Sequence, residues 1–156
     1  MTRRLRVAVV ARSVFPLHGI GGLERHVFDL VRYLADAGVQ VTLVTKEPID
    51  RAPAVDSRLY PESAAPGANA AEIASTTIHP AITVQYVPYR TFPFAGRRWT
   101  TVLDRSTAYP VFGLNAGRAA WELVRDGRID IVHGLGASVL GYARRRAASS
   151  APLVLN

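Results

Sequence analysis

The feature that most constrains this chain is a strand–loop–helix–strand pattern over residues 5–45. Residues 5–11 form a short valine-rich run, which is typical of a buried parallel strand. A helix is expected next, and Gly38 suits the position just after its C-terminus, where the backbone often adopts a left-handed conformation. The apolar residues of this helix fall on one face, and they are Leu23, Val27, Leu30, Val31 and Leu34. Residues 39–45 read as a second strand, so the pattern favours a parallel α/β sheet.

Three glycines stand in the turn that leads into this helix, at residues 18–22. A helix N-terminus offers free backbone N–H groups and the positive end of the helix dipole, which suit an anion. Gly21 and Gly22 carry no side chain, so a phosphate could approach the backbone closely. The same glycines could simply allow a tight turn, and the sequence leaves both interpretations open.

Two common phosphate-binding fingerprints fit this turn poorly. The dinucleotide motif G-x-G-x-x-G needs a third glycine where Glu24 stands, and it should begin directly after the strand. The P-loop needs Gly-Lys followed by Ser or Thr, which does not occur here. We therefore do not expect either of these nucleotide sites.

The rest of the chain extends the same alternation of strands and helices. Further strands are expected over residues 81–88, 129–133 and 152–156. The expected helices cover residues 99–109, which Pro110 should break or kink, then 111–126 and 137–149. With right-handed crossovers this gives a single Rossmann-like domain over residues 1–156, a doubly wound parallel sheet. Functional groups of such a sheet lie past the carboxyl ends of the strands, here at 13–22 and 133–136.

Composition excludes several other classes of protein. The chain is 49% hydrophobic and 20% charged, as an ordinary globular domain is, and it has no cysteine for a disulfide or a thiolate metal site. The net charge of +7 comes from scattered arginines without any nucleic-acid-binding motif, which indicates a solvated basic surface and no nucleic-acid partner. No apolar run approaches the ~18 residues of a membrane helix. The early apolar run is also too short for a signal peptide, so a cytoplasmic location is expected.

Two groups of residues resemble glycosyltransferase family 4. The first group is Pro16, Gly21, Gly22, Glu24 and His26, followed by Gly38, Val39, Val41 and Thr45. The second is the run Asp-Ile-Val-His-Gly at residues 130–134, which is similar to a later strand of the family. The resemblance implies the two-domain GT-B fold, a nucleotide-sugar donor, an acceptor of unknown kind and retention of configuration at the transferred sugar.

The resemblance also implies roles for individual residues. Gly21 and Gly22 match the turn that approaches the donor diphosphate, and Glu24 and His26 match neighbouring substrate-binding positions. Glu24 would also complement the helix dipole without any ligand, and His26 could simply cap the loop.

In the strand that the run at residues 130–134 resembles, the family often has two histidines in the pattern H-x-H. His133 matches the first and is the candidate catalytic residue, Gly134 is a candidate substrate-binding residue, and Leu135 replaces the second histidine. A hydrogen-bonded structural role for His133 is the alternative. Because the chain contains no Asp-x-Asp, neither a metal nor a cofactor is expected.

Two further segments have candidate roles at the acceptor. Residues 48–80 are rich in proline, alanine, serine and glycine, with a short helix expected near 69–74; this long connection is either an acceptor-selecting segment or a mobile loop. Residues 89–99 mix arginines with aromatic side chains, which could dock peripherally on a membrane surface or pack a loop onto the sheet.

The resemblance covers only the N-terminal, acceptor-side half of a GT-B enzyme. The donor-binding C-terminal domain, with its paired glutamates, is not part of these residues. We therefore expect the chain alone to be inactive. The alternative is a stand-alone Rossmann-like module that binds a nucleotide or a partner protein without catalysis.

Overall fold

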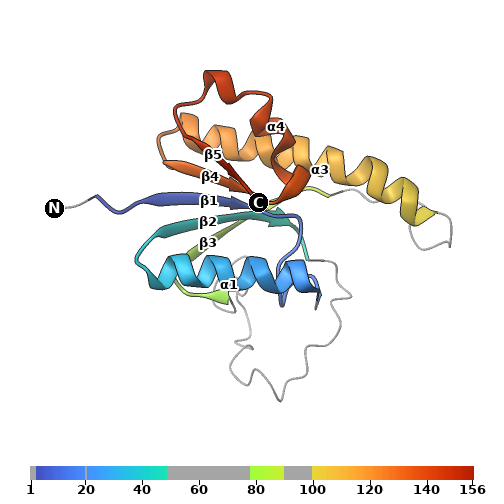
Figure 1. The fold of residues 1–156 in the computed structure, drawn as a ribbon, viewed down its shortest axis with the longest axis horizontal. Coiled ribbons are helices and arrows are strands. Elements are labelled where there is room, and N and C mark those ends of the chain that lie inside the picture. The colour runs from blue at the N-terminus through green and yellow to red at the C-terminus, as the bar shows by residue number, and fades with distance from the viewer. Residues whose placement is uncertain (1–2, 20, 49–77, 90–99) are drawn as a thin grey trace, which may run out of the picture.

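Five parallel strands form a single sheet in the computed structural model, which describes residues 3–19, 21–48, 78–89 and 100–156 (Figure 1). The strands lie side by side in the order β3-β2-β1-β4-β5. Their bounds are β1 Arg6–Val10, β2 Gln40–Lys46, β3 Ile82–Val87, β4 Ile131–Gly134 and β5 Leu153–Leu155. This order confirms the expected Rossmann-like, doubly wound parallel sheet.

Helices cover both faces of the sheet (Figure 1). On one face lies α1, Gly22–Asp36, and on the other lie α3, Thr100–Arg125, and the short α4, Leu140–Ala143. Gly38, with φ +82°, ends the first helical segment as expected, because a left-handed residue there closes the last turn. The helix expected from the apolar stripe between Leu23 and Leu34 is confirmed, and it extends one residue before this stripe and two residues beyond it.

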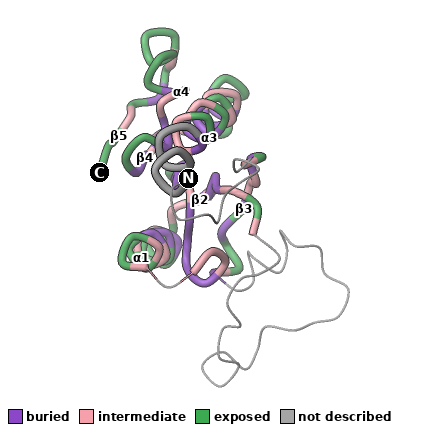
Figure 2. Tube along the Cα trace, turned by 90° about the vertical axis from the view of Figure 1, so that its right-hand side faces the viewer, coloured by how far each residue is buried: buried purple, intermediate pink, exposed green. Residues whose placement is uncertain are grey.

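Each face of the sheet has its own hydrophobic cluster, and the buried residues follow the strands and the inward sides of the helices (Figure 2). The α1 face buries Val27 and Val31 against Val9 and Leu43. Leu23, expected on the same stripe, lies in the first turn of α1 and is instead 54% exposed.

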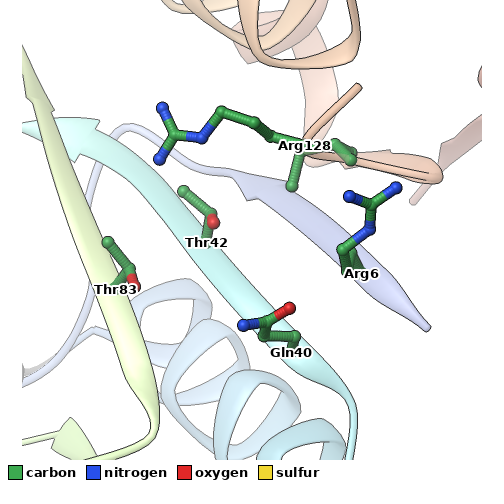
Figure 3. A pocket seen from close by; sticks show the side chains of 6 residues that line it. Arg6, Gln40, Thr42, Thr83 and Arg128 are labelled. Carbon is green, nitrogen blue, oxygen red and sulfur yellow. The ribbon is translucent and has the colours of Figure 1, made fainter. Parts of the chain in front are cut away.

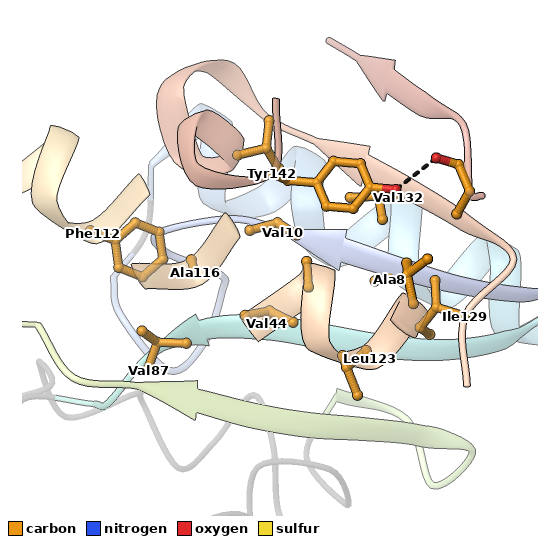
Figure 4. Close-up of a cluster of buried hydrophobic side chains, with 14 residues drawn as sticks. Ala8, Val10, Val44, Val87, Phe112, Ala116, Leu123, Ile129, Val132 and Tyr142 are labelled. Atoms are coloured by element: carbon orange, nitrogen blue, oxygen red, sulfur yellow. Dashed lines mark hydrogen bonds between the residues drawn. The ribbon is translucent and has the colours of Figure 1, made fainter. Parts of the chain in front are cut away.

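The α3 face packs Phe112, Ala116 and Leu123 over Val10, Val44 and Val132 (Figure 4). The hydroxyl of the fully buried Tyr142 donates a hydrogen bond of 2.6 Å to the Ala151 carbonyl oxygen. The polar end of this ring is thus satisfied inside the cluster.

Pro110 was expected to break or kink the helix, and the break is wrong, because the 26-residue α3 runs through Pro110 without interruption. Proline removes one backbone hydrogen bond, but Ala108 and Phe112 on either side of it are buried in the core. Tertiary packing therefore outweighs the local penalty.

The single helix expected over residues 137–149 is also wrong. This segment folds as three short pieces: a 3-10 turn at Gly136–Val139, α4, and a second 3-10 turn at Arg146–Ala148. A Cβ on Gly117 would lie 2.3 Å from the Tyr142 nitrogen, and one on Gly141 would lie 2.2 Å from the Leu114 oxygen. Because α3 approaches this backbone so closely, packing rather than helical periodicity decides its path.

Several expectations fall outside the described residues. They are most of the 48–80 connection with its short helix near 69–74, and residues 90–99 with their proposed membrane contact. Within the described part of the chain, no helix is both long enough and apolar enough to span a bilayer.

Candidate functional site

The strand order puts the topological switch point of the sheet between β1 and β4. The chain moves from β1 to β2 and β3 on one side, and then returns to β4 on the other side of β1. In open α/β sheets, ligands bind outside the carboxyl ends of the strands at such a switch point. The glycine turn before α1 and the segment after His133 both lie there, so the structure brings together the two sequence regions singled out above.

The glycine turn presents an open helix N-terminus. Gly21 is the N-cap residue in an extended conformation, and α1 begins at Gly22. Apart from its chain neighbours and its own helix backbone, no atom of the described residues would lie within 4 Å of a Cβ built on Gly22. Gly22 is also exposed, so no side chain at this position blocks the approach of a ligand to the first turn of α1.

Glu24 partly occupies this N-terminus. A Cβ on Gly21 would lie 2.0 Å from Glu24 Oε2, so the carboxylate folds back over the N-cap residue. This is the third helical position, where an acidic side chain complements the unpaired N–H groups and the dipole. The glycine at 21 thus makes room for a carboxylate of the chain itself, while the glycine at 22 faces open space.

His18 holds the loop that carries the turn. The Val14 N–H donates to His18 Nδ1 at 3.1 Å, and Nε2 lies 2.9 Å from the Lys46 carbonyl oxygen at the end of β2. Both bonds are satisfied by the neutral ring that carries its proton on Nε2, and burial lowers the pKa of His18. Sequence reasoning assigned no role to this histidine, because nothing in its neighbours signals a contact 28 residues away.

His133 lies on β4 and faces the α1 side of the sheet. It is in register with Val9 on β1, whose side chain belongs to the α1-side cluster. Its Nε2 atom is buried and has no hydrogen-bond partner among the described residues. Burial lowers the pKa of His133, and the nearby His26 lowers it further. The ring is therefore neutral at pH 7 and carries an unused hydrogen-bonding atom.

His26 reaches from α1 toward the same region. Its Nε2 atom lies 2.8 Å from the Asn156 side-chain nitrogen, at the end of the chain after β5. The contact joins α1 to the carboxyl end of β5, beside His133. His26 therefore does not simply cap its own loop, and it places a second imidazole near His133.

Gly134 and Leu135 are buried beyond His133. A Cβ on Gly134 would lie 2.3 Å from one methyl carbon of Val139 and 2.5 Å from the other. Leu135 belongs to the α1-side core, so the residue at the second histidine position of the family motif is a packing residue here. Close packing is sufficient to explain a glycine at 134.

On the α3 side of the sheet, hydrogen bonds join β1, α3 and the segment that follows β4. The buried Ser138 Oγ lies 2.6 Å from the carbonyl oxygens of both Val10 and Leu135. The Tyr109 hydroxyl donates to the Leu135 oxygen at 3.3 Å, and the Arg12 guanidinium lies 4.9 Å from the centre of the Tyr109 ring. Sequence reasoning gave these residues no function, because the contacts join segments far apart in the chain.

At the carboxyl ends of β1 and β4 the described residues bring together backbone N–H groups and two imidazoles. Over the described ranges, no group of three or more histidine, cysteine, aspartate or glutamate residues lies close enough together to hold a metal ion. The arrangement suits an anionic ligand at the helix N-terminus and a hydroxyl near the imidazoles.

Solved structures with the same fold are glycosyltransferases. CalG4, the calicheamicin glycosyltransferase, superposes with a TM-score of 0.54 and 17% identity over 99% of this chain and 32% of its own. A UGT transferase from Siraitia grosvenorii in complex with UDP gives a TM-score of 0.52 and 16% identity over 98% of this chain and 27% of its own. The chain therefore spans about a third or less of the length of these GT-B proteins, and the likeness concerns the fold.

The sequence comparisons are more specific about the family. No curated protein matches the chain. The sequence model of glycosyltransferase family 4 matches residues 20–156, which include both Gly22 and His133. The match covers most of the chain, and the chain belongs to glycosyltransferase family 4.

Proposed function

We propose that this chain is the acceptor-side domain of a retaining glycosyltransferase, which moves a sugar from a nucleotide-sugar donor to an acceptor. Membership of family 4 and the GT-B-like fold support a transferase domain. The UDP in the Siraitia grosvenorii structure supports a nucleotide-sugar donor for a protein of this fold.

The observation that carries the proposal is the open helix N-terminus at Gly22. Apart from its chain neighbours and its own helix backbone, no described residue lies within 4 Å of its Cβ position, near the switch point of the sheet. We assign the donor diphosphate to the backbone N–H groups at the start of α1, where the helix dipole favours negative charge. Since the Glu24 carboxylate lies over Gly21, it turns away toward solvent when the diphosphate binds.

His133 has the second role. A buried polar atom without a partner is costly, so its unpaired Nε2 marks a place where a ligand group would be stabilised. We assign to the neutral ring a hydrogen bond to a hydroxyl of the sugar or the acceptor. The lowered pKa keeps the ring uncharged, so that it positions the ligand without competing for the diphosphate.

A second domain completes the site in this proposal. The compared GT-B proteins extend well beyond the region that matches this chain, which covers 32% of one and 27% of the other. A nucleotide-sugar donor also has a base and a ribose that need binding contacts. We assign those contacts to the second domain, together with closure of the site over the sugar.

The test is a transfer assay with the complete enzyme and a panel of nucleotide sugars, with the anomeric configuration of the product read by NMR. We expect transfer with retained configuration, and no transfer by residues 1–156 alone. Inversion would contradict the retaining mechanism. Absence of transfer from every donor, with tight nucleotide binding by the chain alone, would favour a stand-alone binding module.

A further inference from the structure

A polar hollow of about 210 Å³ opens at the opposite edge of the sheet, at the amino ends of β1, β2 and β3 (Figure 3). The residues that line it are Arg6, Gln40, Thr42, Thr83, Arg128 and Ile129. Because the proposed transfer site lies at the carboxyl ends of the strands, this hollow is a separate feature of the molecule.

The floor of the hollow is a polar stretch of the sheet face that α3 covers elsewhere. Thr42 is in register with Ala8 on one side and Thr83 on the other, so both hydroxyls come from one row of the sheet. Val44, two residues farther along β2, is fully buried beneath α3. Parallel sheets usually carry apolar residues on both faces. The two adjacent threonines instead place hydroxyl hydrogen-bond donors on this part of the sheet.

Arg128 is fixed at the rim by the end of α3. The Gly127 N–H bonds to the Val124 oxygen and the Arg128 N–H to the Leu123 oxygen, each at 2.9 Å, which closes the helix. From this anchored backbone the guanidinium extends over the threonine floor (Figure 3). Within the ranges that the structure describes, no carboxylate pairs with it.

The charge balance at this edge is positive. Asp130 bonds to the Arg6 side chain and to the Arg3 guanidinium, each through a contact of 2.7 Å. The single negative charge of Asp130 is therefore shared by two arginines, and Arg128 adds a further positive charge. An anion that entered the hollow would meet a positive field rather than a neutralised ion pair.

Size and donor chemistry limit the ligand. A volume of 210 Å³ is several times the ~30 Å³ that a water molecule occupies in the liquid. It is below the roughly 300–1,000 Å³ of sites for drug-sized ligands. A planar guanidinium fork beside hydroxyl and amide donors matches the oxygens of a phosphate group.

We propose that this hollow is a phosphate site, with Arg128 as the charged fork and Thr42 and Thr83 as hydroxyl donors. Its ligand is inorganic phosphate or the phosphate of a small phosphomonoester. The site is independent of sugar transfer at the carboxyl edge, and it gives this domain a second place to bind an anion.

The test is an NMR titration of the ¹⁵N-labelled chain with inorganic phosphate, at ionic strength held constant with chloride. We expect saturable shifts of the Thr42 and Thr83 amides, with a dissociation constant in the millimolar range. Arg128→Gln should weaken binding about tenfold, as expected for the loss of one charge-assisted hydrogen bond. Thr42→Val should weaken it a few-fold without changing the shape of the floor.

Arg144→Gln is the matched control, since Arg144 is also exposed but lies at the end of α4, away from the hollow. It should leave the dissociation constant unchanged. Equal weakening by both arginine variants would show general charge attraction and overturn the site, as would shifts that never saturate. A parallel titration with glucose 6-phosphate separates the sources: tighter binding than inorganic phosphate assigns a phosphomonoester, and weaker binding assigns the free ion.

Discussion

Two glycine-containing turns meet at the carboxyl edge of the sheet, and they differ in what surrounds them. At Gly22 a Cβ would meet no described residue within 4 Å, apart from its chain neighbours and its own helix backbone. At Gly134 it would meet both methyl carbons of Val139, at 2.3 and 2.5 Å. The next glycine, Gly136, has φ +58° and donates its N–H to the Asn156 oxygen at 3.0 Å. The first turn is open, and the second is filled by the chain itself.

The difference shows that similar sequence patterns can have different physical causes. Glycine at 134 allows close packing of β4 against the segment that follows it. Among the described residues, no close packing requires glycine at 22, and the absence of a side chain there leaves the first turn of α1 open to a ligand. We therefore expect substitutions at the first turn to affect ligand binding and substitutions at the second to affect stability.

Gly22→Val should have the largest effect on activity. The valine side chain would fill the space assigned to the donor diphosphate. We expect transfer by the complete enzyme to fall about 100-fold or more, which is the size of effect seen when a hydrogen-bond donor that stabilises an anion is removed. The melting temperature should change little, because no neighbouring atom is displaced. Rates normalised to folded protein give the comparison, and unchanged rates would contradict the phosphate role.

His133→Leu should separate function from stability. Removing the buried nitrogen that has no described partner should leave stability unchanged or raise it by about 1 kcal/mol. Transfer should fall roughly 100-fold if the ring positions a ligand hydroxyl. His79→Gln is the control, since His79 pairs with Asp36 at 3.2 Å and takes no part in the proposed site. A loss of stability with normal activity per folded molecule would assign His133 a structural role.

Gly134→Ala should act on folding instead. Its Cβ would overlap Val139, and overpacking of this kind costs about 1–3 kcal/mol. Gly22→Ala is the matched change at the open turn and should not destabilise the chain. Chemical denaturation measures both, and Val139→Ala in the Gly134→Ala background should recover part of the loss. Equal stability of Gly134→Ala and Gly22→Ala would contradict the view that only the turn at Gly134 is closely packed.

Asp130 should give the smallest effect, which is seen in how stability changes with pH in the acid range. Hydrogen bonds from the Arg6 side chain lower the pKa of this carboxyl from 3.8 to about 2. The unfolded chain therefore binds the proton first, so the stability from this group is fully present above pH 4 and is lost as the pH falls toward 2. Denaturation midpoints across this range should show a shallower decline in Asp130→Asn than in the original chain; identical slopes would contradict the assignment.

Local patterns in the sequence predicted most of the fold. The valine-rich runs, the helical stripe of α1 and Gly38 act over a few residues, so their effects are visible in the sequence. Pro110 and residues 137–149 were mispredicted because long-range packing decides them. The close approach of α3 to Gly141 depends on how two distant segments meet.

The candidate site was predictable in part. Sequence placed Gly22 and Glu24 at a helix N-terminus, and the resemblance added His133. The tether from His18 to Lys46 and the contact of His26 with Asn156 required the fold, since each joins separate strands or helices. Whether Gly22 or Gly134 faces open space depends on the path of the chain after each turn, and the path after Gly134 is the segment that was mispredicted as one helix.

The most direct test of the central claim is an NMR titration of the chain with UDP and with UDP-sugars. A few backbone donors in an open, solvated site bind weakly, so we expect dissociation constants of about 1 mM or higher, roughly −4 kcal/mol or less favourable. The shifted amides should be those of Gly21, Gly22 and the first turn of α1. Shifts at Gly134 and Gly136 with none at Gly22 would contradict the assignment of the open turn, and a micromolar constant would show a self-sufficient nucleotide site rather than half of one.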